Sequence, residues 1–246
     1  MVRSLMYAAL GSRPDIAFSV TALSRNNVQP LEMHTTEAKR VLRYLKTTAG
    51  FPIHYRWLPN PTTIVGFTDS DWAGNLTTRK SVSRCVLGLG NVNVNNELVT
   101  SGLIHWQAKS QSVVALSTLE AEYIACSHAT RESLWLKRMM KEAAGGMAVK
   151  IVDGPVPIRS DNQGAIKLIA SGVVRQKSKH IDVKYHHVHD EQTKGAVKFQ
   201  YVTSESNPAD LLTKPLAVPR HEHLLQLTGL TRFDSDDGES EYDKSD

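Results

Sequence analysis

Two acidic side chains directly follow a short apolar run in this 246-residue chain. The run from Ile64 to Phe67 is typical of a buried strand, and Asp69 and Asp71 come next. A carboxylate at the end of a buried strand is costly unless something pairs with it. A hard divalent cation is the usual partner of such oxygens. The stretch alone favours solvated aspartates at a polar strand end, and a metal site requires further carboxylates from the rest of the chain.

Further carboxylates recur where a strand ends or a helix begins, namely Glu122, Asp161 and Asp210. Such positions can converge at one edge of an open α/β sheet. Together with Asp69 they would repel one another without cations. Two magnesium ions about 4 Å apart would remove that repulsion and build a phosphodiester-cleaving site. One ion would activate a water molecule and the other would stabilise the leaving oxygen.

The two glutamates near the start of the long expected helix have different expected roles. Ser117-Thr118-Leu119-Glu120 fits a capping box, in which Glu120 reaches back to the amide of Ser117. Glu122 lies two residues further on, about 200° around the helix. It cannot share the capping role, so it is free to face a site.

The periodicity of apolar residues predicts the elements that position these side chains. One helix begins near Ser12, and a second spans residues 34–48. Three strands with short links then indicate an antiparallel meander, and the strand–helix–strand order after it indicates a parallel part of the sheet. The expected ranges are strands 64–72, 81–88 and 103–107, a loop over 90–97, helix 118–144, strand 156–160, helix 163–170, strand 196–202 and helix 219–230. Four aromatic residues are expected in the core: Trp72, Trp106, Trp135 and Tyr123.

Charge is unevenly distributed along the chain. The net charge is +4, but residues 234–246 hold seven acids and one lysine. This segment lacks the apolar residues needed to fold and is expected to be disordered. The remaining, strongly basic chain predicts a polyanionic partner such as nucleic acid. On the second helix, Lys39, Arg43 and Lys46 share one face that can follow phosphates, with a plain solvated face as the alternative.

Cysteine content and hydropathy bear on the compartment. Cys85 and Cys126 show neither metal-ligand spacing nor a disulfide framework, which favours a reducing compartment. The chain shows no secretory signal and no apolar run long enough to span a bilayer, so no membrane partner is expected.

Four blocks of the sequence resemble the ribonuclease H domain of copia-type LTR retrotransposon polyproteins. In chain order they are Phe67-Thr-Asp-Ser-Asp-Trp-Ala-Gly-Asn75, Ser117-Thr-Leu-Glu-Ala-Glu-Tyr-Ile-Ala125, Ser160-Asp-Asn-Gln-Gly-Ala165 and Asn207-Pro-Ala-Asp-Leu-Leu-Thr-Lys214. The stretch from Ser178 to Tyr185 is also typical of these elements. Upstream, residues 13–17 and 40–46 look like the end of the element's reverse transcriptase. The resemblance covers nearly all of the chain up to Leu230.

The resemblance implies a ribonuclease H-like fold, with a five-stranded mixed sheet and helices on both faces. It implies cleavage of RNA in RNA–DNA hybrids by two Mg²⁺ ions, with Mn²⁺ as an alternative. Catalysis and metal binding fall to Asp69, Glu122, Asp161 and Asp210. Hybrid contacts fall to Gly74, Asn75 and Gln163, and such recognition reads shape and 2′-hydroxyls rather than base sequence.

Three parts of the chain are expected. Residues 1–56 form a helical remnant of the reverse transcriptase thumb and connection, residues 62–230 form the nuclease domain, and residues 231–246 form the acidic tail. The remainder of the polyprotein is an implied partner in the parent element. The implied location is the cytoplasm, within a virus-like particle, with the nucleus as an alternative.

Two features depart from the resemblance. Residues 201–206 contain no histidine, although cellular relatives carry one shortly before the last aspartate. The polymerase string Tyr-x-Asp-Asp is absent from this sequence. Two alternatives to an active enzyme therefore stand: a catalytically inactive nucleic-acid-binding remnant, and another member of the superfamily such as a transposase.

Overall fold

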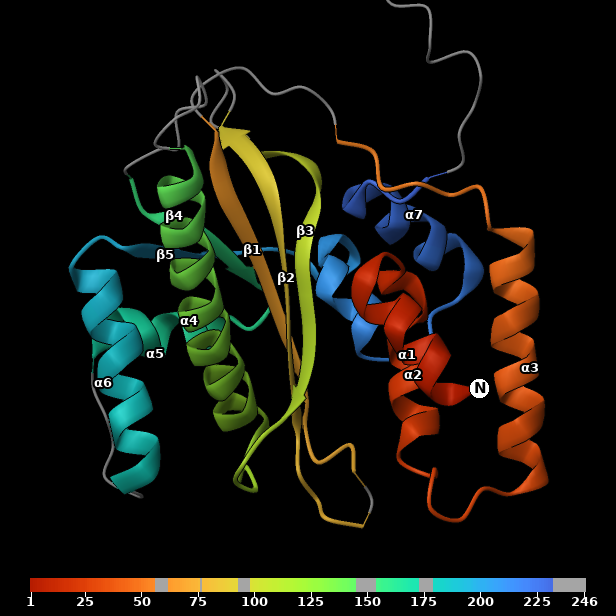
Figure 1. Ribbon diagram of the computed structural model, residues 1–246. Coiled ribbons are helices and arrows are strands. Elements are labelled where there is room, and N and C mark those ends of the chain that lie inside the picture. Colours follow the sequence, from red (N-terminus) through yellow and green to blue (C-terminus); the bar gives the residue numbers. More distant parts are fainter. Residues whose placement is uncertain (56–61, 76, 93–97, 145–153, 173–178, 232–246) are drawn as a thin grey trace, which may run out of the picture.

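A five-stranded sheet forms the centre of the protein, in the order β3-β2-β1-β4-β5 (Figure 1). The computed structural model describes residues 1–55, 62–75, 77–92, 98–144, 154–172 and 179–231. β1 (Thr63–Asp71), β2 (Val82–Val92) and β3 (Leu98–Ser110) pair antiparallel. β4 (Val156–Ser160) pairs parallel with β1, and β5 (Val197–Tyr201) pairs parallel with β4. The expected meander and the expected parallel part are both confirmed.

Helices cover both faces of this sheet (Figure 1). On one face lie α4 (Thr118–Ala144), α5 (Gln163–Ser171) and α6 (Lys179–Thr193). On the other face lie α1 (Val2–Gly11), η1 (Pro14–Ile16), α2 (Ala17–Ser24), α3 (Glu32–Thr47) and α7 (Val218–Thr228), with the short turns η2 (Ser204–Ser206) and η3 (Pro208–Leu212) nearby. This arrangement confirms the ribonuclease H-like architecture that the sequence predicted.

The central strand β1 contributes to two separate cores. Successive strand residues point to opposite faces, so Ile64 packs under α4 with Tyr123. Val65 and Phe67 point to the other face, where they join α1 and α2. Each fully buried side chain of this size contributes about 1.5–3 kcal/mol. The two cores together hold the end of β1 in a fixed place.

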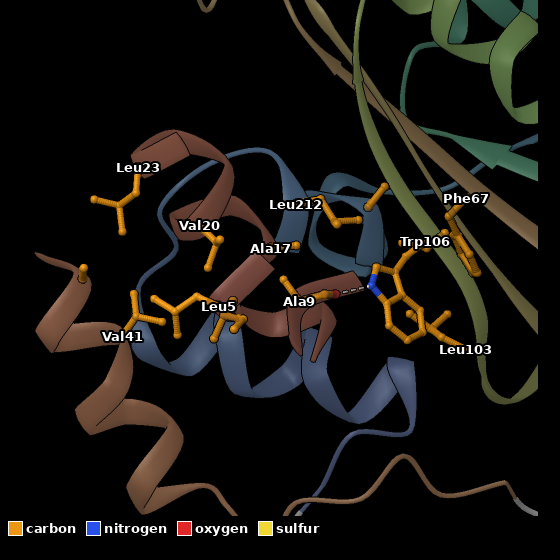
Figure 2. Packing of buried hydrophobic residues seen from close by; sticks show 14 of the residues in the cluster. Leu5, Ala9, Ala17, Val20, Leu23, Val41, Phe67, Leu103, Trp106 and Leu212 are labelled. Atoms are coloured by element: carbon orange, nitrogen blue, oxygen red, sulfur yellow. Dashed lines mark hydrogen bonds between the residues drawn. The ribbon is translucent and has the colours of Figure 1, made fainter. Parts of the chain in front are cut away.

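The N-terminal helices pack directly on the sheet. Trp106 of β3 donates its indole N–H to the backbone oxygen of Ala9 at 2.7 Å, and both residues belong to the same core as Leu5 and Val20 (Figure 2). The expected boundary between the helical segment and the nuclease domain falls on residues 56–61, and the acidic tail on 232–246. Both lie outside the described residues, so the division into three parts stays a prediction.

Some local expectations differ from the structure. α1 and α6 were not expected, and β2 and β3 are longer than expected. Trp106 and Tyr123 are buried as expected, but Trp72 and Trp135 are about half exposed. Residues 93–97 of the expected loop are not described. No helix in the described part of the chain has the length and apolar character needed to cross a membrane.

Candidate active site

The sheet opens at the end of β1. β4 pairs with β1 at Gly66 and Phe67 and ends at Ser160, whereas β1 continues to Asp71. The backbone beyond Thr68 therefore has no strand beside it on the β4 side. Glu122 of α4 fills part of this gap, because its Oε1 accepts the amide N–H of Ser70 at 3.3 Å. Acidic side chains from β1, from α4 and from the residues after β4 can therefore meet in this gap.

Three carboxylates gather in this opening. Asp69, Glu122 and Asp161 each place one oxygen within 4.8 Å of the others. Asp69 and Glu122 are buried, and Asp161 is half-buried. The sequence reasoning named these three residues, and the structure brings them together. Their roles in catalysis and metal binding remain predictions.

The pKa values of the two buried acids are raised. Burial is the main cause of the raised pKa of Asp69, about 7, and nearby Asp210 and Asp161 raise it further, while the hydroxyl of Thr213 opposes this. Burial likewise raises the pKa of Glu122, to about 9, with added repulsion from Asp69 and Asp161. A cation among these oxygens would stabilise their charged forms.

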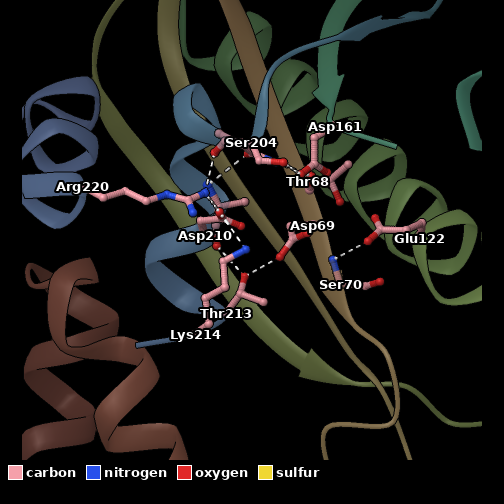
Figure 3. Close-up of polar contacts among 12 residues, drawn as sticks. Thr68, Asp69, Ser70, Glu122, Asp161, Ser204, Asp210, Thr213, Lys214 and Arg220 are labelled. Carbon is pink, nitrogen blue, oxygen red and sulfur yellow. Dashed lines mark hydrogen bonds and ion pairs between the residues drawn. The ribbon is translucent and has the colours of Figure 1, made fainter. Parts of the chain in front are cut away.

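Polar side chains from the segment 204–220 hold two of the acids (Figure 3). Thr213 Oγ1 donates to Asp69 Oδ2 at 2.6 Å. Ser204 Oγ donates to Asp161 Oδ2 at 2.5 Å. Sequence reasoning missed both residues, although Thr213 lies within the fourth quoted block. Serine and threonine are so common that their types alone give no signal of this role.

Asp210 lies beside the three-acid cluster but is not part of it. Its turn η3 is fixed by Asn207, which accepts the N–H of Ala209 and donates to the backbone oxygen of Thr68. The carboxylate is fully buried, and its Oδ2 pairs with Lys214 at 2.9 Å and with Arg220. The structure therefore gathers three of the four predicted acids, and it pairs the fourth with two basic side chains.

The carboxylate oxygens of this site fit a hard divalent cation. Glu122 Oε2 and Asp210 Oδ1 are buried and have no hydrogen-bond partner among the described residues. An unpaired buried acceptor is costly, and Mg²⁺ prefers carboxylate oxygens. Asp69, Glu122 and Asp161 are the residues able to hold such an ion together.

The residues predicted to contact nucleic acid lie in different places. Asn75 orders the loop after β1, because its Oδ1 accepts the N–H groups of Thr77 and Thr78. Gly74 packs so closely on Asp71 that an added Cβ would lie 2.2 Å from Oδ2. Gln163 is exposed at the start of α5, two residues after Asp161. Lys39, Arg43 and Lys46 are exposed on α3, which lies at the outer side of the other helical layer.

Sequence reasoning also missed a hollow beside α4. Its volume is about 380 Å³, and its lining contains no carboxylate. The lining residues are Lys109, Arg131, His128, His187, Gln111, Ile124 and the serines at 83, 110, 112 and 127. Lys109 and Arg131 bring positive charge to this hollow, although Arg131 also pairs with Glu132 at 3.3 Å. The hollow combines β2, β3, α4 and α6, so neighbouring sequence could not reveal it.

No family model matches the chain, but individual relatives do. The retrovirus-related Pol polyprotein from transposon TNT 1-94 of Nicotiana tabacum is 35% identical over 229 residues, which are 93% of this chain and 16% of that protein. The corresponding polyprotein from transposon RE1 of Arabidopsis thaliana is 32% identical over 234 residues, 94% of this chain and 15% of that protein. The chain thus spans about a sixth of the length of these relatives.

Among solved structures, LC11-RNase H1 in complex with an RNA/DNA hybrid is similar with a TM-score of 0.39 and 18% identity. The match covers 61% of this chain and 92% of that one.

Proposed function

Because the chain belongs to the retrovirus-related Pol polyproteins of transposons, we propose that it is the ribonuclease H segment of a copia-type element. Its activity is endonucleolytic hydrolysis of the RNA strand of RNA–DNA hybrids during reverse transcription. The observation that supports this most is the cluster of Asp69, Glu122 and Asp161 at the opening of the sheet. A bound cation would stabilise the charged forms of Asp69 and Glu122, whose pKa values are raised, and would pair with the buried Oε2 of Glu122.

The residues of the chain prepare the site for metal. Asp69, Glu122 and Asp161 would hold Mg²⁺, or Mn²⁺ as the alternative, and Asp210 would complete a second position. Ions bound there would stabilise the attacking and leaving oxygens of phosphodiester hydrolysis. Thr213, Ser204 and the Ser70 amide orient the acids, so their geometry does not depend on metal. Metal binding would displace protons from Asp69 and Glu122.

Binding of the hybrid uses surfaces around this opening. The loop at Gly74 and Asn75 and the exposed Gln163 are proposed to contact the RNA strand, while the hollow with Lys109 and Arg131 accepts backbone phosphates. The exposed basic face of α3 adds sequence-independent attraction. The remainder of the polyprotein is the proposed partner, and the location is the cytoplasm within a virus-like particle, or the nucleus.

A cleavage assay tests this proposal. The full chain is mixed with hybrid labelled on either strand, with Mg²⁺ or with chelator. The wild type should cleave only the RNA strand, and only with Mg²⁺. Asp69→Asn should reduce cleavage by orders of magnitude, because a metal-binding charge is lost. Asp190→Asn, which changes an exposed acid of α6, is the matched control and should retain activity.

Hybrid binding without metal is measured on the same variants. It should persist in Asp69→Asn, since the basic surfaces supply it. A wild type that binds hybrid but shows no Mg²⁺-dependent cleavage above Asp69→Asn would overturn the enzyme proposal. The inactive nucleic-acid-binding remnant would then take its place.

A further inference from the structure

The fourth acid of the site is neutralised by the protein itself. Lys214 Nζ lies 2.9 Å from Asp210 Oδ2, and Arg220 contacts the same oxygen. Figure 3 shows both cations reaching Asp210, with Thr213 between this pair and Asp69. The other oxygen of the carboxylate, Oδ1, is buried without a hydrogen-bond partner in the described part of the chain. One side of Asp210 is therefore occupied by cations, and the other is free.

The two cations are held differently. Arg220 also donates from Nη2 to the backbone oxygen of Ser204 at 2.8 Å, which anchors its guanidinium. Lys214 follows Asp210 by four residues, and its side chain is 44% exposed. Its ammonium is a compact charge on a flexible stem. Lys214 can therefore move from Asp210 into solvent while Arg220 stays paired with Asp210.

The sum of charges shows what the site can hold once metal has displaced the protons of Asp69 and Glu122. The four ionised carboxylates then carry −4, and Lys214 with Arg220 returns +2, which leaves −2. The nearby Asp71 and Arg84 form a pair of their own at 3.2 Å and cancel. A single divalent ion at Asp69, Glu122 and Asp161 neutralises the remainder. A second divalent ion would leave the site positive unless a phosphate arrives or Lys214 departs.

We propose that the Lys214 ammonium is the resident cation of the Asp210 position in the nucleic-acid-free protein. The free protein then binds one divalent ion at the three-acid cluster, and a second ion binds at Asp210 only when Lys214 swings out. Lys214 is thus a positioning residue that couples occupation of the second position to arrival of the polyanionic backbone. This inference rests on the metal-dependent function proposed above.

Manganese binding to the full chain without nucleic acid tests the inference. The number of Mn²⁺ ions bound and their affinities are measured by calorimetry and by electron paramagnetic resonance. Wild type should bind one ion tightly, and Lys214→Met should bind a second one more tightly than wild type by about tenfold or more, within the usual range of coupling between two sites. Lys198→Met removes an exposed lysine of β5 and should match wild type.

A double variant locates the second ion. Lys214→Met combined with Asp210→Asn should lose the gained ion and keep the first. Lys214→Gln repeats the test with a polar side chain, and circular dichroism verifies that each variant is folded. Equal binding of the second ion by wild type and both folded Lys214 variants overturns the inference, while the proposed nuclease activity stands. If neither wild type nor Lys214→Met binds any ion that Asp69→Asn does not, both proposals fail.

Discussion

Two glutamates of α4, two residues apart, show how position decides the role of a side chain. Glu120 Oε2 accepts the N–H of Leu116 at 2.8 Å, and Ser117 Oγ accepts the N–H of Glu120 at 3.1 Å. The capping role is present, although Glu120 reaches Leu116 rather than the expected Ser117. Glu122 faces the opening of the sheet, where it contacts the Ser70 amide.

Substitutions at these two positions should therefore have opposite effects. Glu120→Ala should lower the free energy of unfolding by about 0.5–2 kcal/mol, as loss of a helix cap does, and should leave cleavage nearly unchanged. Glu122→Gln should nearly abolish Mg²⁺-dependent cleavage without loss of stability. Urea unfolding and hybrid cleavage, measured on both variants, test these two assignments. Loss of cleavage in Glu120→Ala with an active Glu122→Gln would exchange the two assignments.

The raised pKa of Asp69 predicts how stability depends on pH without metal. An acid whose pKa is raised on folding contributes stability below its unfolded pKa and loses it as pH rises through the folded value. For Asp69 this window runs from its usual value near 3.8 to about 7. Asp69→Asn should therefore gain stability relative to wild type as pH increases across this window.

Urea unfolding at pH 5 and pH 8 in the presence of chelator measures the difference. Added Mg²⁺ should then stabilise wild type but not Asp69→Asn, because a ligand stabilises only the folded state that binds it. If the free energies of unfolding of wild type and Asp69→Asn differ by the same amount at both pH values, folding does not raise the pKa of Asp69.

The sequence predicted the acidic residues of the site, but it did not predict the side chains that form hydrogen bonds and ion pairs with them. Asp69, Glu122 and Asp161 could be found because a carboxylate beside a buried strand or helix start is unusual. Thr213, Ser204 and Arg220 act through contacts across 144, 43 and 10 residues of sequence. Their residue types are ordinary on any surface, so only the fold reveals these contacts.

The helix α3 has one buried apolar face and one exposed basic face. Ala38 and Val41 are buried toward the core, while Lys39, Arg43 and Lys46 point to solvent. None of these three cations has an ion-pair partner that competes for it among the residues that the structure describes. The face is therefore available to phosphates, and it also fits the plain solvated face that the sequence allowed.

Replacement of Lys39, Arg43 and Lys46 by glutamine separates these two interpretations. If all three neutralise phosphates, the slope of log affinity against log salt should become shallower by about 0.9 for each phosphate that is no longer neutralised. Affinity for hybrid and for duplex DNA should fall alike, because phosphate contacts carry no sequence information. A control variant with glutamine at Lys194 and Lys198 removes charge elsewhere on the surface. An unchanged slope in the triple variant would support the plain solvated face.

Sequence patterns predicted some elements far better than others. The bounds of α4 were predicted correctly because a cap precedes it and glycines follow it. α1 was missed because Tyr7 and Leu10 are apolar yet exposed, which blurs its helical period. α6 was missed because its sequence is mostly polar and histidine-rich, with a weak apolar stripe.

For the whole molecule, the unexpected feature is how closely the N-terminal helices join the sheet. Leu5, Ala9 and Val20 share one core with Val65 and Phe67 of β1. Amphipathic periodicity can show which face of a helix is buried, but it does not tell which element covers that face, and it did not reveal α1. The antiparallel meander and the parallel part of the sheet were predictable from the order of strands and helices along the chain, whereas this shared core depends on contacts between distant parts of the chain.

The shared core predicts that the N-terminal helices and the central sheet unfold together. Leu5→Ala removes a side chain that is 3% exposed, and should lower the free energy of unfolding by about 2–5 kcal/mol. Leu10→Ala changes the same helix at a residue that is 60% exposed, and should change stability by no more than about 0.5 kcal/mol. Circular dichroism and tryptophan fluorescence should report one coincident transition for both variants. Hybrid cleavage by Leu5→Ala should be lost at the same urea concentration, because β1 carries Asp69. An early loss of helix signal in Leu5→Ala, with fluorescence and cleavage retained to the wild-type midpoint, would show instead that residues 1–56 are an independent appendage.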